Sequence, residues 1–270
     1  MGPVRAGPYD LVFLDMGSVL LDGGAMFGIV PRPVWQRHFT PDADNRIELA
    51  CRGLLLAGLG RVVVVDTGAG ARWSDRDRAR YGLGGRDVRD AVRDAGVALE
   101  DVTDVILTHL HFDHAGGAID EGGRPSFPNA TYHVQRRALD WAREPSERDR
   151  GSFRSEDFEP LARAGCLRTV QGDALDVPAV RAILSEGHTT GLQVPVIGDE
   201  VVYPADLVPT TAHLRTAWIM GYDLRPLEVL AEKQALLTLA EARGWHVVFE
   251  HDPRTAAARV ARAEGGFTIA

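Results

Sequence analysis

The chain has 270 residues, of which 45% are hydrophobic and 25% are charged, and its formal net charge is -8 at pH 7. These values are typical of a globular domain, and we expect residues 1–270 to form one domain. The negative charge has no basic stripe to offset it, which argues against nucleic acid as a partner. The arginine-rich segments 72–80 and 136–154 alternate with acidic residues and indicate solvated faces.

The sequence also gives an expectation for the compartment. No charged segment followed by an apolar one opens the chain, and no apolar run reaches the ~20 residues needed to cross a bilayer. We therefore expect a cytoplasmic protein without a membrane partner. The two cysteines, Cys51 and Cys166, provide neither a disulfide framework nor a zinc knuckle.

Apolar residues recur with strand and helix periods, so strands and helices are expected to be interleaved along the chain. In the first half we expect strands at 11–14, 46–56, 61–65, 102–107 and 131–134, helices at 87–95 and 135–142, and a loop rich in Gly and Pro at 21–33. In the second half we expect strands at 179–185, 192–197, 201–203 and 245–249, and the longest helix at 226–243, with apolar positions Leu227, Leu230, Leu237 and Leu239.

The chemistry-bearing residues begin with the run His109-Leu110-His111-Phe112-Asp113-His114, directly after the expected strand 102–107. Alternate residues of an extended segment face the same side, so His109 and His111 can bind one metal ion together. Asp113 and His114 lie where the chain turns, and they can reach a second ion. Such ligands without cysteine favour zinc, iron, manganese or cobalt. Burying these polar groups without a metal would be costly, so the run predicts a metal site.

This run resembles the signature of the metallo-β-lactamase-fold hydrolase superfamily, and the similarity extends along nearly the whole chain. Four further segments are similar to motifs of that superfamily, namely 62–68 with Asp66, 187–191 with His188, 203–206 with Asp206, and 249–252 with His251. The resemblance implies an α/β (α+β) fold, the αββα four-layer sandwich. It also implies two metal sites with a shared ligand. The first would use His109, His111 and His188, the second would use Asp113, His114 and His251, and Asp206 would bridge.

The resemblance further implies a dinuclear hydrolase with two divalent ions, most simply zinc, whose bridging hydroxide cleaves a lactone or another carboxylic ester. Asp113 would hydrogen-bond the hydroxide, and Asp66 would orient a ligand or a loop. Phosphotriesters and phosphodiesters are alternative substrates of the same site. A mononuclear iron persulfide dioxygenase is a third possibility, against which the bridging Asp206 argues. Homodimers are common among such hydrolases, so the resemblance also implies a homodimer as the candidate assembly.

Asp206 also separates the chain from the metallo-β-lactamases themselves, which resemble it but usually carry Cys or Ser at that place. The chain looks nearest to N-acyl homoserine lactonases and methyl-parathion-type hydrolases. In that group, segment 22–28 resembles a loop that covers the substrate, so Met26 and Phe27 are candidates for an apolar wall. The lactonases carry a tyrosine three residues after the bridging aspartate, where this chain has Pro209. Two residues of the following loop, Tyr222 and His213, are the candidates to replace it.

Overall fold

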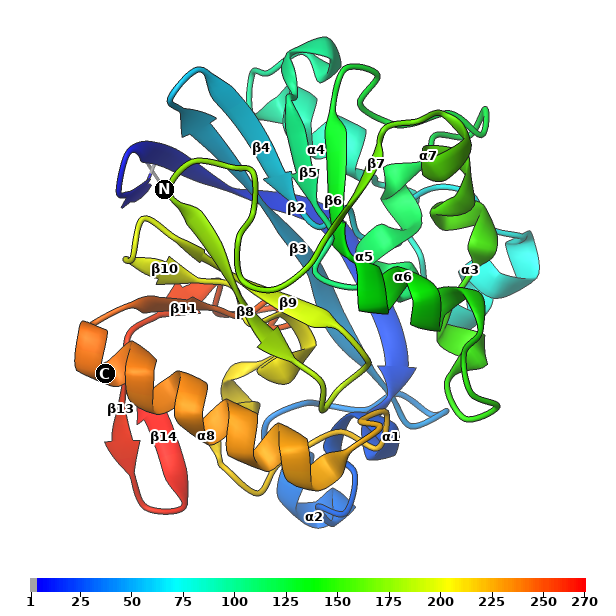
Figure 1. The fold of residues 1–270 in the computed structure, drawn as a ribbon. Helices are drawn as coiled ribbons and strands as arrows, with labels where there is room; N and C mark the ends of the chain where they lie inside the picture. The colour runs from blue at the N-terminus through cyan, green and yellow to red at the C-terminus, as the bar shows by residue number, and fades with distance from the viewer. Residues whose placement is uncertain (1–3) are drawn as a thin grey trace.

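The computed structural model describes residues 4–270 and contains two main β-sheets that face each other, with helices on their outer faces (Figure 1). The seven-stranded sheet has its strands in chain order, β1 (Val4–Ala6), β2 (Tyr9–Asp22), β3 (Arg46–Gly58), β4 (Arg61–Val65), β5 (Asp104–Ile106), β6 (Thr131–Gln135) and β7 (Leu167–Val170). The five-stranded sheet has the order β12 (Ala257–Ala258), β11 (His246–Val248), β10 (Val201–Val202), β9 (Leu192–Ile197) and β8 (Val180–Ser185). A separate hairpin pairs β13 (Val260–Ala263) with β14 (Gly266–Ile269).

The helices lie mostly in the connections between strands. They are α1 (Gly23–Phe27), α2 (Arg32–Trp35), α3 (Asp75–Tyr81), α4 (Val88–Asp94), α5 (Phe112–Ala115), α6 (Arg136–Arg143), α7 (Glu159–Arg163) and α8 (Pro226–Arg243). Short 3-10 turns cover Leu99–Asp101, Gly116–Ala118, Arg150–Ser152, Ser155–Asp157, Ala205–Leu207 and Thr211–Leu214. Among residues 4–270, no helix combines the length and the apolar character needed to cross a membrane.

Three separate apolar cores explain the four layers. Successive residues of a strand point to opposite faces of its sheet, so β3 sends Leu54 and Leu56 into the core between the sheets and Leu55 into the core under the helices. In β4, Val63 and Val65 likewise face the other sheet, while Val64 faces α4. Because both faces of these strands are covered, they consist of nearly continuous apolar runs.

The third core lies between the five-stranded sheet and α8, which crosses the outer face of that sheet (Figure 1). The residues of α8 that are buried are Val229, Lys233, Leu236, Leu237 and Ala240, a spacing of three and four residues that forms one helical face. Leu227, which we grouped with the apolar positions of this helix, is 80% exposed. Of the four leucines at the predicted apolar positions, only Leu237 is among the buried residues of this helix.

The structure confirms the predicted fold class and most predicted elements. The strands at 61–65 and 192–197 and the long helix at 226–243 have the expected bounds. The loop expected at 21–33 is wrong in part, because it contains α1 and the start of α2. The signals were present: Asp22 caps α1 by accepting a hydrogen bond from Ala25 N at 2.7 Å, and a proline lies in the first turn of α2. The prediction missed β1, α3, α7, β7 and the strands β12, β13 and β14.

Asp157 provides a test of the packing behind the histidine run. Its side chain is buried, and neither carboxylate oxygen has a hydrogen-bond partner among residues 4–270. Burial raises the pKa of Asp157 to about 7, although Arg154 opposes the rise. The folded protein therefore holds the proton more tightly than the unfolded chain does. The tighter binding of this proton stabilises the folded protein. Its contribution is fully present below the ordinary aspartate pKa of about 4, and it is lost as the pH rises through the folded pKa.

We therefore expect Asp157→Asn to stabilise the protein more at about pH 8 than at about pH 5, by a difference of roughly 2 kcal/mol in the free energy of unfolding. Denaturant titration at the two pH values measures the difference. Asp101→Asn, at an exposed aspartate, is the matched control and should change stability little at either pH. An equal effect of Asp157→Asn at both pH values would show that the folded carboxyl has no raised pKa.

Candidate metal centre and substrate cavity

The candidate ligands lie beyond the ends of strands from both sheets. β4 precedes Asp66 and β5 precedes the histidine run in the seven-stranded sheet, whereas β8, β10 and β11 precede His188, Asp206 and His251 in the five-stranded sheet. Backbone contacts join the two sets, since Ala50 N in β3 donates to His251 O at 3.2 Å. The strand ends therefore bring residues from distant parts of the sequence to one place at the junction of the sheets.

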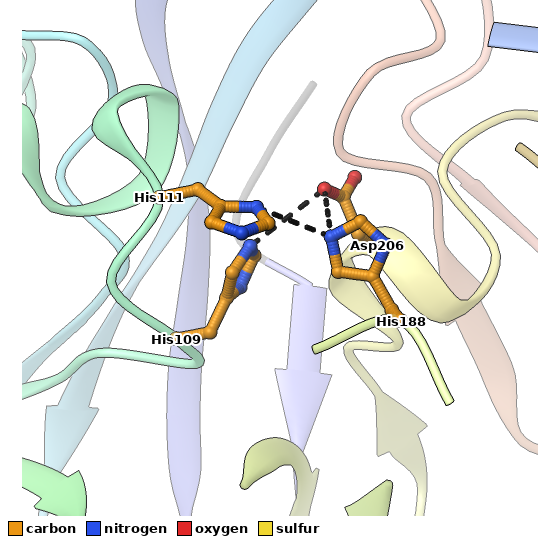
Figure 2. A group of neighbouring side chains, drawn as sticks. All are labelled: His109, His111, His188 and Asp206. Carbon is orange, nitrogen blue, oxygen red and sulfur yellow. Dashed lines mark hydrogen bonds and ion pairs between the residues drawn. The ribbon is translucent and has the colours of Figure 1, made fainter. Parts of the chain in front are cut away.

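A first cluster contains four buried side chains, His109, His111, His188 and Asp206, which point toward one another in Figure 2. Their ligand atoms all lie within 4.8 Å of one another. Asp206 Oδ2 lies 3.0 Å from His188 Nε2 and 3.7 Å from His109 Nε2. His188 Nε2 also lies 3.2 Å from His111 Nδ1. This is the set that the sequence predicted for the first ion, with Asp206 beside it.

A second cluster contains Asp113, His114 and His251, whose ligand atoms also lie within 4.8 Å of one another. Asp206 reaches this cluster too, because its Oδ2 lies 3.4 Å from His114 Nε2 and its Oδ1 lies 3.2 Å from His251 Nε2. The Asp206 carboxylate therefore lies between the two clusters. The geometry matches the predicted bridging position, while the assignment of each ligand to an ion stays a prediction.

The polar atoms at the centre of the clusters fit divalent cations. Three buried atoms there have no hydrogen-bond partner among residues 4–270, namely His109 Nε2, His114 Nε2 and Asp206 Oδ1. Leaving a buried polar group unpaired costs about 1–3 kcal/mol, so such a concentration of unpaired atoms needs a partner of another kind. Imidazole nitrogens and carboxylate oxygens are suitable ligands for divalent transition-metal ions.

The outer edges of the imidazole rings are held by neighbouring groups. The contacts are His188 Nδ1 with Asp223 Oδ1 at 2.8 Å, His251 Nδ1 with Ala50 O at 2.7 Å, and His109 Nδ1 with Thr108 Oγ1 at 3.1 Å. Contacts of this kind fix ring orientation and make the metal-facing nitrogen a better ligand. They leave Nε2 of each of these rings facing the centre of the clusters.

His114 is held by two carboxylates. Its Nδ1 lies 3.0 Å from Asp66 Oδ2 and 3.1 Å from Glu250 Oε2, and both acids are fully buried. Asp66 also accepts hydrogen bonds from Thr108 N and Thr108 Oγ1, each at 2.7 Å. Asp66 has the supporting position expected from the sequence, but Glu250 was not predicted to act on the site. The available signal was an acid two residues after the buried strand β11 and one residue before His251.

Burial and carboxylates act in opposite directions on the rings. Burial and the neighbouring histidines hold the pKa of His109 and that of His111 well below the usual range, whereas carboxylates prevail at other rings. Burial lowers the pKa of His188, but the Asp206 and Asp223 carboxylates outweigh burial and raise it to about 10. Burial also lowers the pKa of His251, and Asp206 again raises it, to about 9. The carboxylates thus favour positive charge on or between the rings. The same field favours a bound cation.

A cavity of about 400 Å³ opens over the clusters. Its floor contains His111, Asp113, His188, Asp206 and His251. Its apolar walls are formed by Leu20, Leu21, Met26, Phe112 and Met220. Its other walls include Tyr81, Tyr222 and the arginines Arg46, Arg80 and Arg148. Arg80 and Arg148 are exposed, as expected for the solvated faces of segments 72–80 and 136–154, and they also line this cavity.

Only two of the four candidate substrate contacts lie at the cavity surface. Met26 and Tyr222 line the cavity, whereas Phe27 and His213 are buried behind it. His213 Nδ1 lies 2.7 Å from Thr210 Oγ1, its Nε2 donates to Met26 O at 2.9 Å, and its ring stacks on Phe27. Burial lowers the pKa of His213 to about 3, so the ring is neutral. His213 and Phe27 therefore support the wall that Met26 provides.

The facing sheets and the paired histidine and aspartate clusters define an αββα protein with a candidate two-metal centre. Residues 49–251 match the sequence model of the Metallo-beta-lactamase superfamily, and the chain belongs to that superfamily. The chain is 32% identical over 171 residues to the N-acyl homoserine lactonase AttM of Azorhizobium caulinodans, a match that covers 60% of this chain and 62% of the relative. The chain thus spans less than two thirds of the length of that lactonase.

Solved structures agree with the fold. A probable metal-dependent hydrolase from Staphylococcus aureus has a TM-score of 0.89 at 24% identity, covering 99% of both chains. The dizinc quorum-quenching lactonase AidC has a TM-score of 0.81 at 22% identity, covering 99% of this chain and 96% of that one. At these identities the likeness establishes the fold alone.

Glu250 offers a test of the metal centre that does not depend on activity. Glu250→Gln keeps the side-chain size but removes one of the two carboxylates beside His114. We expect the affinity for one of two zinc ions to fall roughly 10- to 100-fold, as is typical when a partner behind a metal ligand is lost. Competition with a chromophoric chelator measures the affinity of each ion, and circular dichroism checks the fold.

Glu264→Gln, at an exposed acid, is the control for the loss of one negative charge and should bind both ions like the original protein. If folded Glu250→Gln also binds both ions with unchanged affinity, Glu250 does not act on the metal centre.

Proposed function

We propose that the protein is a metal-dependent hydrolase that cleaves a lactone or another carboxylic ester. The observation that carries this proposal is the position of Asp206 between two histidine-containing clusters at the floor of a 400 Å³ cavity. His109, His111 and His188 would hold one divalent ion, Asp113, His114 and His251 would hold a second, and Asp206 would contact both. Such ions, which we propose to be zinc, supply an activated water and a Lewis acid for the electrophile.

Asp113 is the proposed proton acceptor at the floor of the cavity. Its Oδ1 lies 4.0 Å from His114 Nε2 and its Oδ2 lies 3.8 Å from His251 Nε2. At these distances it forms no direct hydrogen bond with either ring, although it lines the cavity. One oxygen can therefore serve as a ligand while the other accepts a proton from the attacking water.

Tyr222 is the proposed donor to the substrate. Burial raises the pKa of Tyr222, and the negative charges of Asp113 and Asp22 raise it further. The hydroxyl consequently stays protonated near neutral pH and can donate a hydrogen bond to an ester oxygen. Pro209 cannot take this role through a side-chain donor, and its carbonyl oxygen accepts a hydrogen bond from His251 N at 3.0 Å.

The walls of the cavity support an organic ester as the substrate. Leu20, Leu21, Met26 and Met220 provide apolar surface beside the clusters, which is typical of sites that bind small organic molecules. The similarity to AttM, which is named an N-acyl homoserine lactonase, supports the same substrate class. The contacts of Asp206 with both clusters favour two ions over the single iron of a persulfide dioxygenase.

Tyr222→Phe tests how the substrate is oriented. We expect kcat/KM for the best ester or lactone to fall at least ~10-fold, because a donor to the developing negative charge is lost. The metal content should not change. Tyr81→Phe is the matched control, because Tyr81 also lines the cavity but packs against Trp73 and Phe112 through its ring. An equal rate for Tyr222→Phe and the original protein would remove the Tyr222 hydroxyl from the reaction.

The function itself is tested with a panel of an acyl homoserine lactone, an aryl ester, a phosphotriester and a phosphodiester. Metal content is measured by mass spectrometry on the same sample. We expect about two metal ions per chain and turnover of the lactone or the ester, both lost in Asp206→Asn. Turnover of phosphoesters alone would show that the protein is a phosphoesterase and not a carboxylic ester hydrolase. One iron per chain without hydrolysis would contradict the proposal, as would turnover retained in metal-depleted Asp206→Asn.

A further inference from the structure

The walls of the cavity carry more positive charge than the chain as a whole. Arg46, Arg80 and Arg148 all line the cavity, although the net charge of the chain is -8. These arginines come from three separate parts of the chain, β3, α3 and the turn after α6. The fold therefore gathers guanidinium groups beside the metal centre.

Arg46 has a structural role in this arrangement. Its guanidinium forms an ion pair with Asp42 at 2.8 Å, so its charge is balanced. Its Nη1 donates to the carbonyl oxygens of Ala79 at 3.2 Å and Arg80 at 2.8 Å. Arg46 thereby holds the end of α3, which places Arg80 at the cavity.

Arg148 is fixed in place but lacks a carboxylate partner. Its Nη2 donates to the carbonyl oxygen of Gly221 and to that of Asp223 at 3.3 Å, the residues on either side of Tyr222. The Asp223 carboxylate is already engaged by His188 and by Met220 N, each at 2.8 Å. Within residues 4–270, no acid forms an ion pair with Arg148 or with Arg80, and the Arg80 guanidinium lies over the Tyr81 ring.

One acid outside the metal clusters also lines the cavity, but its oxygens have other partners. Asp22 Oδ1 accepts a hydrogen bond from Ala25 N at 2.7 Å, and its Oδ2 accepts one from Asn45 Nδ2 at 2.9 Å. The charges of Arg80 and Arg148 together exceed that of Asp22. With a neutral acyl chain in the cavity, Arg148 would contact only the two carbonyl oxygens and water, and Arg80 only water and the Tyr81 ring, whose centroid lies 5.2 Å from its guanidinium carbon.

We propose that Arg148, with Arg80 contributing to the same positive wall, binds an anionic group of the substrate. The substrate would then be an ester or lactone that carries a carboxylate or phosphate away from the reacting carbonyl. A guanidinium group presents a planar set of donors that matches both anions. Anchoring by the carbonyls of Gly221 and Asp223 means that little side-chain freedom remains to be lost on binding. This inference rests on the proposed hydrolase function and narrows its substrate class.

Matched esters test the inference directly. The substrates are p-nitrophenyl hexanoate, its analogue with a terminal carboxylate, and its analogue with a terminal phosphate, assayed with the zinc-loaded protein. We expect kcat/KM to be at least ~10-fold higher for an anionic ester than for the neutral one, mainly through a lower KM. This preference should weaken with added salt, because salt screens the attraction. The two anionic arms distinguish a carboxylate from a phosphate.

The ratio of anionic to neutral kcat/KM is the readout for the variants. Arg148→Gln should lower the ratio to about 1, which means that anionic and neutral esters are cleaved equally well. Arg148→Lys should retain part of the preference for anionic esters, because the positive charge remains. Arg168→Gln, at an exposed arginine of β7 outside the cavity, should leave the ratio unchanged. Metal content and circular dichroism confirm that each variant is loaded and folded.

The outcomes separate the two proposals. Turnover of all esters with no anionic preference, or a preference that Arg148→Gln leaves intact, overturns the inference and keeps the hydrolase function. Absence of turnover on every ester, with the neutral acyl homoserine lactone still cleaved, overturns the inference and keeps the hydrolase function. Absence of turnover on the esters and the lactone by the fully loaded protein overturns both.

Discussion

The arrangement of this molecule depends on one constraint, the burial of unpaired imidazole nitrogens around the Asp206 carboxylate. The Nε2 atoms of His109 and His114 are buried without a hydrogen-bond partner among residues 4–270. Asp206 lies within 3.7 Å of both atoms and of His188 Nε2. Protein groups already contact the outer nitrogens of these rings. Cations at the centre would compensate both the unpaired nitrogens and the negative charge of the carboxylates.

Both sheets contribute the buried side chains around Asp206. Strand ends of the seven-stranded sheet carry the histidine run, and strand ends of the five-stranded sheet carry Asp206, His188 and His251. Polar contacts between the sheets hold the two sets in register. Gln193 Nε2 donates to Leu107 O at 2.7 Å, and the Tyr203 hydroxyl donates to Arg52 O at 2.6 Å. A shift of one sheet against the other would therefore disturb the centre and break these buried hydrogen bonds.

The cavity wall depends on the same connections. The loop that follows Asp206 contains Thr210 and His213, and His213 holds the carbonyl oxygen of Met26 in α1. Gly221, further along this loop, donates to Ala25 O at 2.7 Å. The segment that covers the cavity is thus hydrogen-bonded to the segment that carries the shared carboxylate. One continuous stretch of chain, from Asp206 to Gly221, therefore links the position of Asp206 to this part of the cavity wall.

The sequence was informative where chemistry and strand pattern coincide. His109 to His114 follow an apolar strand, and a rigid strand end favours ligands that converge. The metal-binding character of this run could be predicted for this reason, whereas the remaining candidate ligands and the layered fold were predicted from the resemblance to the superfamily. The predictions were incomplete where a role depends on contacts between segments far apart in the sequence. Arg148 lies in a charged stretch typical of solvated faces, and only the fold brings it against Gly221 and Asp223.

Buried supporting residues were equally hard to predict. Glu250 contacts His114 across 136 positions of the chain, and His213 contacts Met26 across 187. A short-range sequence pattern cannot show such pairs, because residues of this kind also serve as ordinary core or turn residues. Phe27 resembles a substrate contact in a glycine-rich segment, but its ring stacks on Trp35 and His213 instead.

The central claim is that two cations share the Asp206 carboxylate, and anomalous X-ray diffraction at the zinc edge tests it most directly. Crystals of the zinc-loaded protein should give two anomalous peaks ~3.5–4 Å apart, as in other two-metal sites. One peak should lie among His109, His111 and His188, and the other among Asp113, His114 and His251, with Asp206 between them. A lone peak, or two peaks that Asp206 does not contact, would contradict the account.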